Sequence, residues 1–122
     1  MSGFISNATA NRKARTVSIG AGASLSGGID CLGQTLVGII LPAGWTTATL
    51  SFQGSVDGTN WYNIYAASGS EVVTGSFSAS SYVALDPADF AGVPQLKVRS
   101  GSSSAATNQV SAVSPTLVFR GV

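Results

Sequence analysis

The chain has 122 residues and a formal net charge of +1, and only 9% of its residues are charged, against about a quarter in an average globular domain. The length predicts one domain with one core, and an apolar fraction of 44% excludes a disordered chain. The near-neutral charge argues against a nucleic-acid binder, and the lack of histidine excludes Ser–His–Asp and Cys–His catalysis and zinc sites that use histidine.

Residues 1–15 are polar and weakly patterned, and we interpret them as an N-terminal arm in front of a domain of residues 16–122. The basic residues cluster only in this arm, at Arg12, Lys13 and Arg15. A short basic segment is either a solvated tail or a contact to a partner, so these three are candidate interaction residues. No secretory apolar segment follows them, and the run 36–41 is too short to span a bilayer. The sequence therefore predicts a soluble protein that is made in a cytoplasm and has no membrane partner.

From Thr16 onward the dominant period is two, which is typical of half-buried β-strands. The clearest strand is "TATLSFQGSV", whose apolar positions alternate with polar ones: Ala48, Leu50, Phe52 and Val56. In "QLKVRS" the same alternation predicts that Lys97 and Arg99 face outward. Further strands are predicted in "TVSIG", "EVVTGSF", "SYVAL" and "TLVFRG". The run "TLVGIIL" fits either a strand buried on both faces or one with a bulge at Gly38.

Clusters of Gly, Ser, Pro and Asn separate these strands roughly every ten residues. This spacing predicts an all-β fold, a single-domain, jelly-roll-like β-sandwich behind the short arm. The one helical signal is "LDPADFAG", where Asp86 is an N-cap candidate, Pro87 suits the first helical position and Gly92 ends the turn. It predicts a single turn within a connection.

The stretch "GSVDGTNWYNIY", residues 54–65, is predicted to be a β-hairpin, because Asp57–Gly58 is a strong turn signal. Alternation gives the return strand two faces: one with Trp61, Asn63 and Tyr65, the other with Tyr62, Ile64 and Ala66. One of these faces must belong to the core. The other, together with Trp45, is either part of a protein interface or a platform on which sugars stack. Trp45, Trp61, Tyr62 and Tyr65 are therefore candidate interaction residues.

We predict no enzymatic activity and no cofactor. Asp57 and Asp86 have turn or cap roles, and Glu71 is the one carboxylate without such an explanation. The glycine stretch "GAGASLSGG" lacks the lysine and hydroxyl residue that a phosphate loop requires. The single cysteine, Cys31, excludes an intrachain disulfide and is predicted to be a small buried hydrophobic residue.

The segments "LPAGWTTATLSFQGSVDGTNW", "SFQGSVDGTNWYNIY" and "YVALDPADFAGVPQLKVRSG" resemble small β-sandwich proteins of tailed-bacteriophage particles. The resemblance covers roughly residues 36–101. It implies a head decoration or cement protein that binds the major capsid protein and stabilises the shell. Such proteins are often trimers, and several use an N-terminal arm, which would give the basic cluster a purpose.

The resemblance thus implies a virion protein on the capsid surface, made in the host cytoplasm, and a homo-oligomer, with a trimer favoured. Similar hairpins also occur in carbohydrate-binding sandwiches, so a lectin-like module that binds a glycan is the first alternative. An accessory protein of the phage tail or baseplate is the second.

Overall fold

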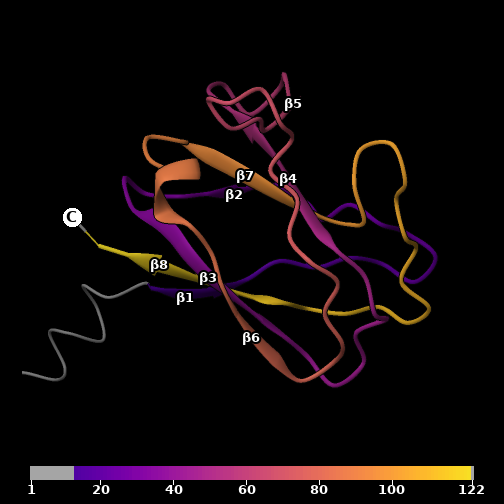
Figure 1. Cartoon of the computed structure of the whole chain (residues 1–122). Helices are drawn as coiled ribbons and strands as arrows, with labels where there is room; N and C mark the ends of the chain where they lie inside the picture. Colours follow the sequence, from indigo (N-terminus) through magenta and orange to yellow (C-terminus); the bar gives the residue numbers. More distant parts are fainter. Residues whose placement is uncertain (1–12, 122) are drawn as a thin grey trace, which may run out of the picture.

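The computed structural model describes residues 13–121, which form two four-stranded antiparallel sheets packed as a β-sandwich (Figure 1). The strands of sheet 1 are, in spatial order, β1 (Ala14–Thr16), β8 (Thr116–Arg120), β3 (Thr35–Leu41) and β6 (Ser81–Ala84). Those of sheet 2 are β2 (Ile29–Asp30), β7 (Gln95–Ser100), β4 (Leu50–Ser55) and β5 (Tyr62–Asn63). The prediction of an all-β sandwich is confirmed.

The strand pairing is nested. β1 pairs with β8, β2 with β7, β3 with β6 and β4 with β5. The connections 31–34, 56–61 and 85–94 consequently gather at one end of the sandwich, which we call the short-loop end. The amide of Cys31 donates to the carbonyl of Pro94 there, at 2.8 Å. At the opposite, long-loop end, the Gln109 amide side chain binds both backbone groups of Thr46, at 2.7 and 3.1 Å.

The core lies between the sheets, where the alternation of each strand directs its apolar side chains. Leu50, Phe52, Leu96 and Val98 are buried as predicted, and Leu117 and Phe119 of β8 are buried as well. The Phe52 ring meets the Phe90 ring edge to face, with centroids 4.8 Å apart. The alternation also groups Val56 with these inward residues, and this prediction is wrong. Val56 is 80% exposed, because β4 ends at Ser55.

Three strand predictions are refined by the structure. The register between β3 and β8 shifts between Leu36 and Gly38, which is the bulge option for the glycine. The predicted strand "EVVTGSF" is instead a connection with isolated bridges at Glu71 and Phe77. The first strand begins at Ala14, so the predicted boundary between arm and domain falls inside β1.

The two predicted turns are both present at the short-loop end. Asp57 Oδ1 accepts hydrogen bonds from the amides of Asn60 and Thr59 at 2.8 and 2.9 Å. These backbone donors, with Asn60 the stronger, hold the pKa of the Asp57 carboxyl well below its usual range. The predicted helical turn is the 3-10 helix η1 (Pro87–Asp89), capped by Asp86, whose side chain accepts from the amide of Ala88 at 3.0 Å. No helix within residues 13–121 is long and apolar enough to cross a membrane.

Candidate functional site

The outer face of sheet 1 has an uncharged area that extends across all four of its strands. Its outward side chains form two adjacent rows, which we call the neutral face: Tyr82, Ile40, Thr116 and Thr16 in one row, and Ala84, Gly38, Val118 and Ala14 in the other. The next outward row brings the charge of Arg120 opposite Thr35 and so bounds the neutral face on that side. Sequence reasoning could have found this surface, because every outward position in these rows is a small, hydroxyl or apolar residue.

Tyr82 is the largest residue of the neutral face, and its side chain is 63% exposed. A Cβ atom at Gly38 would lie 3.0 Å from Tyr82 Cε1, so the ring lies against β3 at the glycine. Ile40, its neighbour across the strands, is also exposed. The neutral face therefore offers an aromatic ring and an aliphatic side chain on a surface otherwise made of small groups, a composition that suits protein contacts.

The outer face of sheet 2 carries a cluster of polar side chains around Arg99. The guanidinium is 2.8 Å from Asn63 Oδ1, 3.2 Å from Ser51 Oγ and 3.5 Å from Glu71 Oε2. Glu71 also accepts from the amide and hydroxyl of Ser103, at 3.2 and 2.9 Å. Arg99 points to the outer face, as predicted, but it is only 8% exposed, because the segments of Glu71 and Ser103 cover it.

Trp61 lies on the same outer face, at the other end of β7. The Lys97 ammonium nitrogen is 4.5 Å from the centroid of its ring, which is cation–π distance. A Cβ atom at Gly28 would lie 2.7 Å from two atoms of the ring, so the glycine provides the space in which the indole packs. Trp61 is half-buried and joins the β4–β5 hairpin to the segment that precedes β2.

This packing predicts different effects for two neighbouring glycines. Gly28→Ala should displace the Trp61 ring, shift tryptophan fluorescence to the red and cost about 1–3 kcal/mol through overpacking. Gly27→Ala is the matched control, because nothing lies within 4 Å of a Cβ atom there. Emission spectra and urea unfolding of both variants measure the effect, and equal behaviour of the two would contradict the placement of Trp61.

The structure does not bring the four predicted aromatic interaction residues onto one surface. Trp45 is 4% exposed and belongs to the core, so it is no part of a stacking platform. Ile64 packs against the core, which assigns the face of Tyr62 to the inner side of sheet 2, and Trp61 to the outer side. Tyr62 and Tyr65 are both exposed, but Tyr62 points away from the face that carries Trp61.

Of the predicted basic cluster, Arg12 lies outside the described residues, and Lys13 is exposed. Arg15 was predicted to be a candidate interaction residue of the arm. Instead, it points inward from β1 and connects sheet 1 to the segment between β2 and β3. Its guanidinium lies 4.1 Å from the centroid of the Phe119 ring. It donates to the carbonyl oxygens of Asp30 and Cys31 and, at 2.9 Å, to Gln34 Oε1. These contacts make Arg15 a structural residue that closes one edge of the sandwich.

Replacement of Arg15 therefore should lower stability. Arg15→Ala is expected to cost about 2–3 kcal/mol. Each charge-assisted hydrogen bond contributes about 1.5–3 kcal/mol, but water can replace Arg15 as the donor to some of the acceptors. Lys13→Ala, in the exposed neighbouring position, should change the unfolding free energy by less than about 0.5 kcal/mol. Urea unfolding measures both, and an Arg15→Ala variant as stable as the parent would restore Arg15 to the candidate interaction residues.

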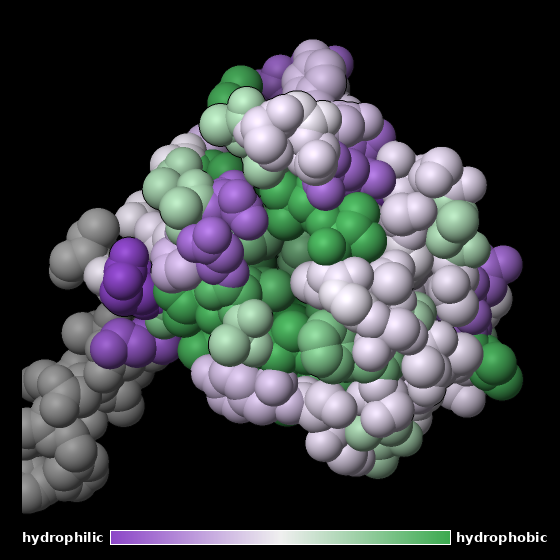
Figure 2. Space-filling view, in the orientation of Figure 1, coloured by the Kyte–Doolittle hydropathy of each residue, from purple (hydrophilic) through white to green (hydrophobic). Residues whose placement is uncertain are grey.

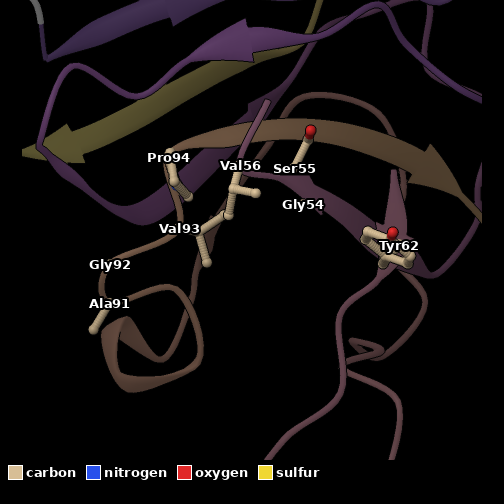
Figure 3. A pocket seen from close by; sticks show the side chains of 8 residues that line it. All are labelled: Gly54, Ser55, Val56, Tyr62, Ala91, Gly92, Val93 and Pro94. Carbon is tan, nitrogen blue, oxygen red and sulfur yellow. The ribbon is translucent and has the colours of Figure 1, made fainter. Parts of the chain in front are cut away.

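An apolar pocket opens at the short-loop end, with a volume of about 250 Å³. Figure 3 shows its lining, with Ala91 to Pro94 on one side and Tyr62 on the other. The lining residues are Gly54, Ser55, Val56, Tyr62, Ala91, Gly92, Val93 and Pro94. None of them is charged, and the Ser55 hydroxyl is engaged with the backbone of Asp57 and Gly58. Figure 2 shows that apolar residues also gather in a hollow between the part of the molecule that carries β5 and the part that carries β6.

Sequence patterns gave no sign of the pocket, because residues of three separate segments line it.

The ionisable groups of residues 13–121 suggest no metal site and no reactive thiol. No group of three or more His, Cys, Asp or Glu within residues 13–121 could hold a metal ion. Burial raises the pKa of the Cys31 thiol to about 11, so the thiol stays protonated at neutral pH.

No family model matches the chain, and no curated protein or solved structure is significantly similar to it. A proposal for its function therefore depends on its surfaces.

Proposed function

We propose that the chain is a structural protein of a tailed-bacteriophage particle, a head decoration or cement protein that binds the shell of major capsid protein. It is made in the host cytoplasm and resides on the capsid surface. It binds as a homo-oligomer, with a trimer favoured, and acts by covering and bridging shell subunits, without catalysis or a cofactor.

The neutral face of sheet 1 is the observation that carries this proposal. It is a surface of four strands without a charged side chain, with Tyr82 and Ile40 exposed on it. Cores of protein interfaces are depleted of charges and enriched in tyrosine, so this composition matches a surface that is covered in use. Contacts of this kind gain strength from repetition over a particle, because linked copies bind with avidity.

The nested strand order adds support of a weaker kind. Pairing of the first strand with the last, and so on inward, is the order obtained when one long hairpin is wrapped into two sheets, and we interpret it as a jelly roll. Jelly rolls occur in viral capsid proteins and also in lectins, so the architecture alone does not choose between them. The dispersal of the predicted aromatic platform favours the assembly role over glycan binding.

Binding to phage heads that lack this protein tests the proposal. Ile40→Lys and Ala84→Lys each put a charge on the neutral face, and burial of an unpaired charge is costly, so each should weaken co-sedimentation with heads at least tenfold. Ser68→Lys adds the same charge in an exposed turn and should bind like the parent.

Three results would contradict the proposal. The first is a parent protein that does not bind heads, and the second is binding to isolated tails instead, which would favour the accessory role in the tail or baseplate. The third is saturable quenching of tryptophan fluorescence by a glycan that is lost in Trp61→Ala, which would favour the lectin-like module.

A further inference from the structure

We propose that the pocket at the short-loop end binds the Phe4–Ile5 segment of the N-terminal arm of a second copy of this chain. Copies would then be linked by exchange of arms. This inference concerns the free protein and does not rest on the proposed binding to phage heads.

The chemistry of the pocket calls for an apolar occupant. Val56 and Tyr62 are 80% and 67% exposed, although both line a concave surface with Val93 and Pro94. An apolar cavity of ~150 Å³ is sufficient for a benzene molecule. The pocket volume of about 250 Å³ therefore accommodates an aromatic ring together with part of a second side chain.

The arm contains one candidate for this role. In "MSGFISNATANR", Phe4 and Ile5 are adjacent large apolar residues, and their neighbours Gly3 and Ser6 are small. Small flanking residues let a backbone approach a protein surface closely. The rest of the segment after Ile5 is polar or small up to Arg12, which suits a linker.

The place where the arm leaves the domain sets its reach. Ala14 begins β1 at the short-loop end. The next residue, Arg15, donates to the carbonyls of Asp30 and Cys31, and the Cys31 amide donates to the carbonyl of Pro94, which lines the pocket. The segment from Ile5 to Ala14 spans up to ~30 Å when extended, at about 3.3 Å per residue. This length would be sufficient to reach a neighbouring copy.

The direction of β1 favours the pocket of a neighbour. β1 lies on the side of β2, whereas β5, which bears Tyr62, is at the opposite edge of sheet 2 (Figure 1). β1 runs from the short-loop end into the domain, so the arm is attached at that end. For an arm that continues in the direction of β1, binding within one chain would require a reversal across the connections 31–34 and 85–94.

The mass of the protein in solution, measured by light scattering, tests the exchange. The parent should be an oligomer with a mass that is a multiple of 12.2 kDa. Val56→Asp in the pocket and Phe4→Ser/Ile5→Ser in the arm should each give monomers. Val110→Asp is the matched control, because Val110 is 79% exposed at the long-loop end, and this variant should remain oligomeric. A monomeric parent, or an oligomer that persists in all variants, would overturn the proposal.

Disulfide trapping identifies the occupant. Ile5→Cys chains that carry an affinity tag are mixed with untagged Ala91→Cys chains under mild oxidation. Arm exchange predicts a tagged–untagged disulfide dimer, which Val110→Cys in place of Ala91→Cys should not give. A double variant, Ile5→Cys/Ala91→Cys, that forms its disulfide only within single chains would show that the arm binds its own pocket. That result would contradict exchange between copies while leaving binding to heads open.

Discussion

Arg99→Ala is expected to destabilise the protein by about 3 kcal/mol, because breaking a buried ion pair leaves the remaining charge without compensation. Glu71 would lose its cation, and Asn63 and Ser51 would lose their donor. The remaining carboxylate is largely covered, with its side chain 14% exposed. Urea unfolding followed by tryptophan fluorescence measures the change in free energy.

A double replacement separates the cost of an orphaned charge from the contribution of the pair. Arg99→Met/Glu71→Met removes both charges and should regain most of the stability lost in Arg99→Ala, since apolar replacement of a whole buried pair is often neutral. A loss below about 1 kcal/mol in Arg99→Ala would show that the cluster is solvated and that the outer face of sheet 2 is open.

Phe52→Ala is expected to cost about 4 kcal/mol, the typical penalty for truncation of a buried phenylalanine. Its ring is fully buried and packs edge to face on Phe90, so the loss includes an aromatic contact as well as a cavity. Thermal and urea unfolding both report it.

The control for Phe52 lies further along the same predicted alternation. Val56→Ala should change stability by less than about 0.5 kcal/mol, because Val56 is exposed and β4 ends before it. Similar losses in the two variants would mean that the strand continues through Val56 and that the pocket at the short-loop end is wrongly described.

Local chemistry predicted much of the fold. Period-two alternation placed the inward residues of β4, β7 and β8, and the Asp57–Gly58 and Asp86–Pro87 signals placed two turns, because each depends on neighbours in sequence. The exposure of Val56 was not predicted, because alternation does not mark where a strand ends. The segment "EVVTGSF" was wrongly predicted to be a strand, because strand formation there depends on whether a partner strand is available.

The candidate sites were less predictable, since they depend on contacts between distant segments. Arg99 is buried because Glu71 and Ser103 cover it, and Arg15 is structural because Asp30, Cys31 and Gln34 receive its hydrogen bonds. Neither role has a signal in the local sequence, where both residues read as exposed cations. Trp45, likewise, is a core residue that sequence reasoning could equally assign to an interface.

We therefore propose separate roles for two surfaces. The neutral face of sheet 1 is proposed to contact the phage shell, and the pocket at the short-loop end is proposed to link copies. They lie on different parts of the sandwich, so a variant in one should not abolish the function of the other. Ile40→Lys should remain oligomeric, and Val56→Asp should retain weaker binding to heads, because avidity but not the contact itself is lost.

A cryo-EM reconstruction of heads mixed with the purified protein tests the central claim most directly. Our account predicts added density at symmetry-related positions on the shell, into which the sandwich fits with Tyr82 and Ile40 toward the capsid subunits. Bare heads, or density in which the outer face of sheet 1 points to solvent, would contradict it.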